Sequence, residues 1–371
     1  MQRSYLDDYT FNSIKGIAVI LLYILHFFAS SFLWLPDFYL SKFLLFENYF
    51  QFSANLCVAI FAFLTGYGFW CSANKTLRHS CTKSIKVLRV YWIIYFTFFL
   101  IAVGCGLYYD FTLRKVILEL FGLGDEVISG EIMPFCWYIS FYIVTIFFLP
   151  FLNLFLERYR NIFRDVFYIL ILPFFLFSFI GSSIESMPGL KKLFVDLNLW
   201  FPCVGLGYIT ARYSLFEQLD SVIDSFCRNK NDKIRFEIIA SIVFVIITIC
   251  GMYYYPGLIY TSKSAFHFQF VLNMSVFYIL FFNYAIIKLV NLITVSLVKL
   301  VLTELGKYSL YMWLLNGVFF NVFKEYTQPL LIYPHYAVLI LIWGLLICFV
   351  LTKGFVLIES IIQGGMSREN N

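Results

Sequence analysis

The sequence predicts an all-α membrane protein, a polytopic bundle of about ten transmembrane helices. Of its 371 residues, 61% are hydrophobic and 13% are charged, whereas soluble domains carry roughly 25% charged residues. Apolar runs of about 20 residues recur, which is the length that crosses a bilayer as a helix. The period-two alternation of a membrane barrel is absent. We therefore expect helical spans, which satisfy their own backbone hydrogen bonds in lipid.

The candidate spans form a single transmembrane domain over residues 1–371, with no separate soluble domain. The first run is too long for a removable signal peptide and lacks a cleavage site, so it is expected to remain as the first span. Residues 288–306 are amphipathic and are expected to form an interfacial helix or an extension of the preceding span. The ten spans lie near 14–34, 46–71, 87–109, 134–155, 165–184, 193–213, 236–255, 266–287, 307–323 and 336–361.

The distribution of Lys and Arg in the short loops predicts the orientation of the chain. Residues 71–89 carry five basic residues and no acidic one, so this loop is expected to be cytoplasmic. Residues 110–133 carry an excess of acidic residues and are expected to lie outside. With ten spans, both termini are then cytoplasmic.

Composition disfavours several other classes of function. The net charge of +5 gives no indication of nucleic-acid binding. The nine cysteines are scattered, without a CxxC pair or zinc-ligand spacing. No carboxylate–histidine metal spacing is present either, so we expect no metal. The cysteines are expected to be small buried hydrophobes.

The first span, "NSIKGIAVILLYILHFF" (12–28), contains two cationic-type residues, Lys15 and His26. Eleven residues at about 100° each return to within about 20°, so both lie on one helical face, about 16 Å apart in height. An ionisable residue at the depth of His26 is a candidate for function, although a hydrogen-bonded core histidine is the alternative. Lys15 is either a snorkelling anchor or a contact for the phosphates of a long anionic ligand.

A basic cluster opens the third span. The stretch "TKSIKVLRVYW" (82–92) spaces Lys83, Lys86 and Arg89 three residues apart along one side of a helix. These cations either only mark the cytoplasmic side or bind phosphate at a cytoplasmic mouth. The two interpretations are compatible.

Five motifs in order resemble the acyltransferase family 3 integral membrane proteins. The family places an Arg, ten residues and a His in span one, where this chain has Lys15 and His26. Its second span ends in a pattern similar to "IFAFLTGYGF" (60–69). Its third span opens with a basic residue, two others, Arg and an aromatic–proline pair, similar to Lys86, Arg89 and Tyr91 with Trp92 in the proline position. Its fourth and late motifs are similar to "CWYISFYIVTIFFLP" (136–150) and "LGKYSLYMWLLN" (305–316).

The resemblance implies an enzyme that transfers an acyl group, expected to be acetyl, from cytoplasmic acyl-CoA to a hydroxyl of a glycan or a lipid-linked sugar. It makes His26 the catalytic residue and Lys15, Lys86 and Arg89 the acyl-CoA contacts. Two positions depart from the family pattern. Lys15 replaces an Arg, so a point-charge contact replaces a bidentate one. Asn316 stands where the family usually has a second His, which argues against a two-histidine mechanism.

The expected chemistry is general-base catalysis, because a sugar hydroxyl must lose its proton as it attacks the thioester and a neutral imidazole suits that task. An acyl-histidine intermediate is the other route. Glu131 could orient His26 or the acceptor, although a solvated loop acid is the alternative. Candidate contacts for the substrate or the oxyanion, each of which could also serve only packing, are Tyr67, Trp137, Tyr138, Ser309 and Asn316.

Two other functions stay open at this level. A transporter or flippase for a lipid-linked saccharide predicts paired midplane charges and repeated halves. A polysaccharide polymerase predicts a large outer loop carrying Arg. The expected partners are acyl-CoA, the saccharide acceptor and membrane lipid. The Phe- and Tyr-rich composition, with Lys used more than Arg, points to an AT-rich bacterial genome. The expected location is the bacterial cytoplasmic membrane.

Overall fold

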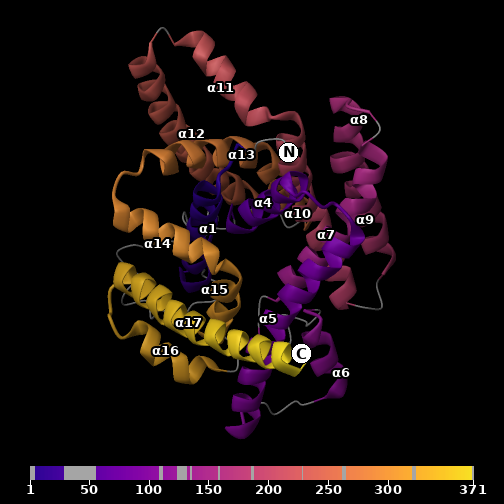
Figure 1. The fold of residues 1–371 in the computed structure, drawn as a ribbon, viewed down its shortest axis with the longest axis vertical. Helices are drawn as coiled ribbons and strands as arrows, with labels where there is room; N and C mark the ends of the chain where they lie inside the picture. Colours follow the sequence, from indigo (N-terminus) through magenta and orange to yellow (C-terminus); the bar gives the residue numbers. More distant parts are fainter. Residues whose placement is uncertain are drawn as a thin grey trace.

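The computed structural model describes residues 5–28, 56–107, 112–122, 132–133, 136–157, 159–184, 188–227, 229–260, 265–319 and 323–369. Every regular element in these ranges is a helix (Figure 1). In chain order they are α1 Asp8–Phe28, α4 Leu56–Cys71, α5 Leu77–Gly104, α6 Leu113–Leu120, α7 Trp137–Leu156, α8 Ile162–Val166, η2 Phe167–Ile171, α9 Leu172–Ser183, α10 Pro188–Tyr213, α11 Leu215–Phe226, α12 Lys230–Tyr260, α13 Ala265–Leu292, α14 Ser296–Lys307, α15 Ser309–Asn316, η3 Gly317–Phe319, α16 Lys324–Ile332 and α17 Ala337–Glu369.

Six helices of the described chain are long and apolar enough to cross a membrane. They cover Asp8–Phe27, Leu77–Gly104, Trp137–Leu156, Ile162–Ser183, Leu190–Tyr213 and Val338–Gln363. Three shorter apolar helices fall in other predicted spans, at Leu56–Cys71, Tyr278–Leu292 and Ser309–Phe319. The all-helical membrane class is therefore confirmed, whereas the count of ten spans stays a prediction.

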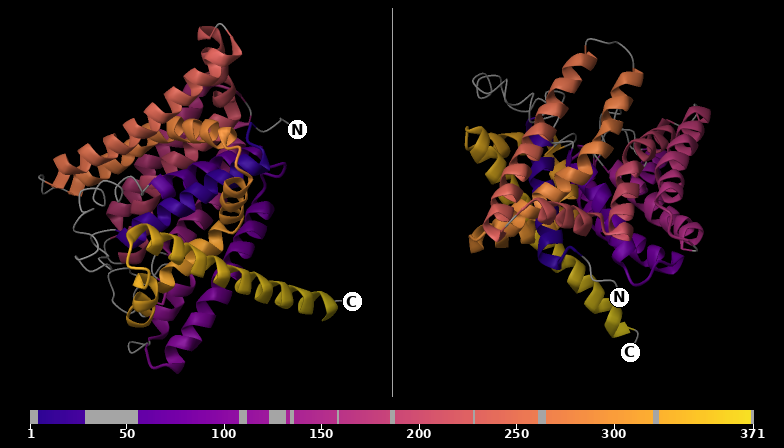
Figure 2. Two further views of the ribbon diagram at one scale, coloured as in Figure 1. Left: turned by 90° about the vertical axis from the view of Figure 1, so that its left-hand side faces the viewer. Right: turned by 90° about the horizontal axis from the view of Figure 1, so that it is seen from above.

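Helix α1 begins and α17 ends on the same side of the bundle (Figure 2). An even number of crossings would produce this arrangement. That this side is the cytoplasmic one remains a prediction from the basic loops.

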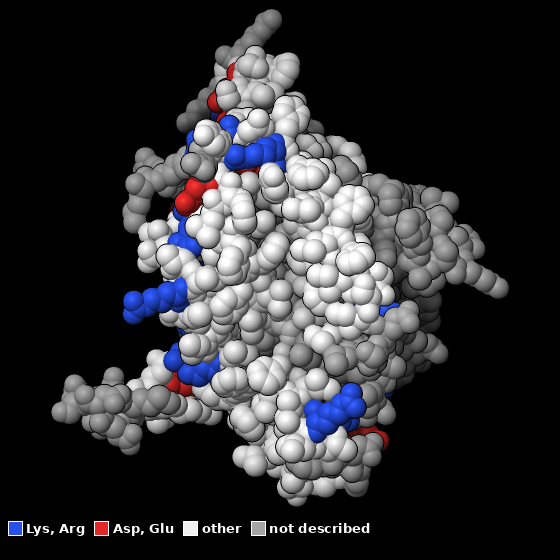
Figure 3. Space-filling model, turned by 90° about the vertical axis from the view of Figure 1, so that its right-hand side faces the viewer, with Lys and Arg blue, Asp and Glu red and all other residues white. Residues whose placement is uncertain are grey.

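The lateral surface of the bundle is apolar, as a lipid-facing surface must be. On the side seen in Figure 3, a broad central area carries no Lys, Arg, Asp or Glu. Large hydrophobic side chains stand exposed on α7 and α9, among them Leu154, Phe155 and Phe179. A soluble protein rarely exposes so much apolar surface, so lipid is the natural neighbour of these residues.

Glycines bring two helix pairs into backbone contact. A Cβ on Gly66 of α4 would lie 1.9 Å from the Val204 carbonyl oxygen of α10, and one on Gly207 would lie 2.0 Å from that of Phe63. A Cβ on Gly306 of α14 would likewise lie 1.7 Å from the carbonyl oxygen of Asn12 in α1. Small residues permit such close crossings in membranes. The contact at Gly306 fixes α14, and the following α15, against α1.

Helix α9 follows a widened turn caused by Pro173. Proline has no N–H to donate to the preceding turn. Over Phe167–Ile171 the helix widens into π geometry, in which the N–H of Leu172 donates to Phe167. Such bulges are a recognised way to accommodate a break in the helical hydrogen-bond ladder.

The amphipathic helix α11 holds the start of the chain in place. The Tyr5 hydroxyl donates to Asp220 at 2.7 Å, and Lys288 of α13 pairs with the same carboxylate at 2.6 Å. Burial by itself raises the pKa of Asp220, but the hydrogen bonds from Lys288, Tyr284 and Tyr5 outweigh it and hold the pKa below its usual value. The carboxylate is therefore ionised and anchors α1 near its first turn.

Candidate active site

The imidazole of His26 is buried between α1 and α15. It is 5% exposed, and its Nδ1 forms a short hydrogen bond with Oδ1 of Asn316, which is fully buried. The two residues are 290 positions apart in the chain. The structure thus brings together two residues that the sequence analysis had assigned to separate roles, a base and an oxyanion contact.

Neighbouring contacts between the two helices hold this pair. The Tyr23 hydroxyl, one turn before His26, donates to the carbonyl oxygen of Met312 at 3.0 Å. The ring of Phe27 packs edge-on against Phe319, with centroids 5.8 Å apart. Polar and aromatic contacts therefore flank the imidazole and restrict its position.

The hydrogen bond defines the tautomer of His26. A carboxamide oxygen only accepts hydrogen bonds, so Nδ1 must carry the proton. In a neutral imidazole the lone pair is then on Nε2. The amide nitrogen Nδ2 of Asn316 has no hydrogen-bond partner among the described residues. The pair therefore offers a proton acceptor on the ring and a hydrogen-bond donor on the amide.

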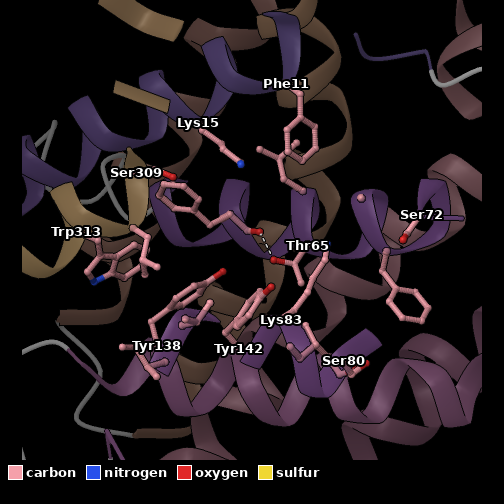
Figure 4. Close-up of a pocket in the computed structure, with 18 of the residues that line it drawn as sticks. Phe11, Lys15, Thr65, Ser72, Ser80, Lys83, Tyr138, Tyr142, Ser309 and Trp313 are labelled. Carbon is pink, nitrogen blue, oxygen red and sulfur yellow. Dashed lines mark hydrogen bonds between the residues drawn. The ribbon is translucent and has the colours of Figure 1, made fainter. Parts of the chain in front are cut away.

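A cavity of about 270 Å³ lies between α1, α4, α5, α7 and α15. Figure 4 shows Lys15 pointing into it from α1, with Thr65 across from it and the hydroxyls of Tyr138 and Tyr142 directed inward. Lys83 and Ser309 line it as well. His26 and Asn316 are not among its lining residues.

An aromatic stack closes the cavity on the side of His26. The rings of Tyr138 and Trp313 stack with centroids 4.4 Å apart, and Phe61 packs on Trp313 at 5.3 Å. Trp313 precedes Asn316 by three residues, which is one turn of α15. The last residue of α15 that lines the cavity is Leu314, two positions before Asn316, so along α15 the cavity ends less than one helical turn short of the His26–Asn316 pair.

The cavity carries cations without acidic partners. Lys15 and Lys83 line it together with the imidazole of His79, and none of its lining residues, all from the described chain, is Asp or Glu. The Lys15 ammonium lies 4.7 Å from the centroid of the Phe11 ring. An anion fits such a setting, because it meets positive charge without displacing an acidic side chain.

Two of the predicted acyl-CoA contacts lie elsewhere. The Arg89 guanidinium pairs with Glu359 of α17 at 2.6 Å, and the Tyr311 hydroxyl donates to the same carboxylate. Lys86 is exposed and does not line the cavity. Residues 83 and 89 are six positions apart, which separates them by about 120° around the helix. Lys83 therefore faces the cavity while Arg89 faces α17.

The other candidate residues divide in the same way. Ser309 and Tyr138 line the cavity, whereas Tyr67 is buried between the rings of Phe63 and Phe216. Trp137 packs edge-on against Tyr138 at 5.8 Å, away from the cavity lining. Glu131 lies outside the described residues.

Among the lining residues that the sequence pattern did not assign to the site are His79 and Trp313. His79 precedes Lys83 by four residues and shares its helical face, so the spacing could have shown it. Trp313 lies in an apolar motif, and the local pattern does not distinguish it from a residue of the core. Among the described residues, no group of three or more His, Cys, Asp and Glu side chains comes together as a possible metal site.

Fold and site together define a polytopic helical membrane protein with a buried, oriented imidazole beside a cationic cavity. The family model of an acyltransferase domain matches residues 8–353, essentially the whole chain. The protein belongs to acyltransferase family 3, and the resemblance seen in the five motifs is thereby confirmed. Comparison with curated proteins and with solved structures gave no match.

Proposed function

We propose that this protein transfers an acyl group, with acetyl as the expected one, from acyl-CoA to a hydroxyl of a glycan or lipid-linked sugar. The observation that carries this proposal is the hydrogen bond from His26 to Asn316. It gives a buried imidazole the tautomer that a general base requires, in a chain of an acyltransferase family.

His26 acts as the base in this proposal. The acceptor hydroxyl attacks the thioester carbonyl while Nε2 of His26 takes its proton. The carbon–sulfur bond then breaks, and the proton passes from the imidazolium to the departing CoA thiolate. The products are an ester and CoA–SH, and the imidazole returns to its starting state.

Asn316 has two tasks in this mechanism. Its Oδ1 accepts from Nδ1–H of His26 and would also stabilise the imidazolium, because the same proton remains in place as the ring becomes charged. Its Nδ2, buried and without a partner among the described residues, is a candidate donor to the developing oxyanion. A second histidine at this position is not required for either task.

The donor binds from the cavity. Lys15 and Lys83 supply positive charge for the phosphates of acyl-CoA, and no Asp or Glu stands among the described residues that line the cavity. His26 is eleven residues beyond Lys15, about 16 Å along α1. A long, thin donor arm is needed to cover this distance, and the phosphopantetheine arm of CoA has that form. The stack of Tyr138 and Trp313 stands on the route and must open for the thioester to reach His26.

The test is transfer of labelled acetyl from acetyl-CoA by the purified chain, measured both as CoA release and as label in a saccharide fraction. His26→Gln is expected to lower both by roughly 10²–10⁴-fold, since general-base catalysis contributes that much. His79→Gln is the matched control, because it removes an imidazole from the cavity lining and leaves His26 in place. Full transfer by His26→Gln would falsify the mechanism. If the protein were instead a transporter of saccharides, neither the wild type nor His26→Gln would release CoA.

A further inference from the structure

A second cavity, of about 310 Å³, lies between α9 and α10. Its polar lining consists of Ser178 and Ser182 from α9 and of Lys191 and Asn198 from α10, and its other lining residues are Phe177, Gly181, Phe194 and Val195. It shares no residue with the cavity around Lys15. The proposed transfer reaction assigns no role to this second cavity.

The two cavities lie toward opposite ends of the bundle. Helices α4 and α10 run antiparallel, because Phe63 contacts Gly207 while Gly66 contacts Val204. The last residues of α4 and the guanidinium of Arg212 meet at Trp70, close to the end where the first cavity lies. Lys191 is 21 residues before Arg212, about 32 Å along α10. The second cavity therefore lies toward the other membrane face.

Asn198 brings a buried, unsatisfied hydrogen-bond acceptor to the lining of this cavity. Its side chain is 7% exposed, and its Nδ2 donates to the hydroxyl of Ser178 at 2.9 Å. Its Oδ1 has no hydrogen-bond partner among the described residues. A buried acceptor left without a donor costs about 1–3 kcal/mol, and each such group in a folded protein calls for an explanation. A ligand hydroxyl in the cavity would satisfy this oxygen.

Lys191 adds positive charge to the same cavity, and no Asp or Glu is among its lining residues, which all belong to the described chain. The Ser182 hydroxyl donates to the carbonyl oxygen of Phe179 at 2.8 Å, so its oxygen can still accept. The lining therefore fits a ligand that is anionic at one point and donates hydroxyl hydrogen bonds at another.

The surroundings indicate that this ligand is part of a lipid. Phe175 and Phe179 of α9 are 64% and 73% exposed, beside Ser178 on the same helix. Together with the apolar area in Figure 3, they provide a surface for acyl or prenyl chains. A soluble phosphate would gain nothing from this neighbourhood, whereas a lipid would bury its chains while its headgroup enters the cavity.

We propose that the cavity between α9 and α10 binds the hydroxyl-bearing phosphate headgroup of a membrane lipid, with the phosphate at Lys191 and a hydroxyl donating to Asn198. Phosphatidylglycerol and a polyprenyl-phosphate-linked sugar share this chemistry. The inference does not depend on the transfer reaction, because a bound lipid would occupy the site whether or not the protein acylates it.

Native mass spectrometry of the full detergent-purified chain tests the proposal, with phosphatidylglycerol and phosphatidylcholine as probes. Phosphatidylcholine carries a phosphate but no hydrogen-bond donor, so the wild type is expected to prefer phosphatidylglycerol. Lys191→Ala should weaken phosphatidylglycerol binding about 5- to 10-fold, which corresponds to about one kcal/mol for a lost charge contact. Lys192→Ala, the same charge change at a neighbouring position outside the lining, should stay within about twofold.

Asn198→Leu should abolish the preference for phosphatidylglycerol over phosphatidylcholine, because the hydroxyl loses its acceptor. Size-exclusion behaviour checks that this variant folds, and the exposed Lys191 provides an independent test that leaves the core intact. Competition by a polyprenyl-phosphate-linked sugar then identifies the source: displacement of phosphatidylglycerol assigns the site to a lipid-linked saccharide, and its failure assigns it to phospholipid. Equal losses in Lys191→Ala and Lys192→Ala, or an unchanged preference in Asn198→Leu, would overturn the proposal.

Discussion

The His26–Asn316 pair and the Lys15–Lys83 cavity lie along the same helix α1 but differ in how their polar groups are satisfied. The imidazole is buried and held by an amide from α15. The two lysines face the cavity, and no Asp or Glu is among its described lining residues. One region is buried and held by a side-chain hydrogen bond, whereas the other is a cavity whose described lining carries positive charge without an acidic side chain.

This difference separates catalysis from binding. A preorganised proton acceptor contributes to the chemical step, because its geometry need not be assembled in the transition state. Unpaired cations contribute to the capture of an anion and have little influence on the rate of the chemistry. Substitutions at the two regions should therefore affect different kinetic constants, in a way that tests the comparison directly.

The largest effect after His26 itself is expected at Asn316. Asn316→Leu removes the acceptor of Nδ1–H and leaves a buried donor unpaired, so the orientation of the imidazole is lost. We expect kcat to fall by about 100-fold, while the affinity for CoA changes little. Steady-state kinetics with acetyl-CoA separate the effect on kcat from the effect on donor binding.

Asn316→Asp distinguishes positioning from packing at this site. The carboxylate keeps an oxygen that accepts from Nδ1–H, so part of the lost rate should return, with an altered pH profile. A purely structural Asn316 predicts the opposite, namely that Asp, as a buried charge, is the more damaging change.

The cavity lysines are expected to have the next largest effect. Lys15→Ala and Lys83→Ala should each weaken CoA binding by about 10-fold, as expected for a charge-assisted contact of about 1.4 kcal/mol. Isothermal titration with CoA gives the affinity, and added salt should reduce the difference from wild type. Lys86→Ala is the matched control, and we expect no change there. Equal losses of CoA affinity in all three variants would indicate a general positive potential and not a specific binding site.

The aromatic stack that separates the two regions offers a smaller and more selective effect. Trp313→Ala removes the ring that stacks on Tyr138 and should widen the route toward His26. We expect longer acyl-CoA donors to gain several-fold in kcat/KM relative to acetyl-CoA, about 1 kcal/mol of discrimination. Trp313→Phe keeps an aromatic ring and should keep the acetyl preference. An unchanged donor profile in the alanine variant would place the route elsewhere.

The residues show where sequence reasoning ends. Helical periodicity and hydropathy predicted the all-helical membrane fold. Lys15 and His26 both lie on α1, the helix for which the eleven-residue offset was argued. Only packing could reveal that Asn316, 290 positions away, holds the imidazole. The three-residue spacing grouped Lys83 with Arg89. It gave no sign that Arg89 forms an ion pair with Glu359 of a distant helix. Side-chain partners between distant helices are set by tertiary contacts that a local pattern does not encode.

Arg89 gives the smallest expected effect and the sharpest test of that distinction. In the structure it ties α5 to α17 through Glu359, and both side chains are partly exposed. Arg89→Ala should therefore lower the free energy of unfolding by about 1 kcal/mol or less, measurable as a lower midpoint of thermal unfolding in detergent. CoA affinity should stay within about twofold of wild type. Glu359→Gln should reproduce the loss of stability, because it breaks the same pair. A loss of CoA binding in Arg89→Ala but not in Glu359→Gln would instead mean that the guanidinium leaves Glu359 to bind the donor, and the separation of cavity cations from structural cations would fail at this residue.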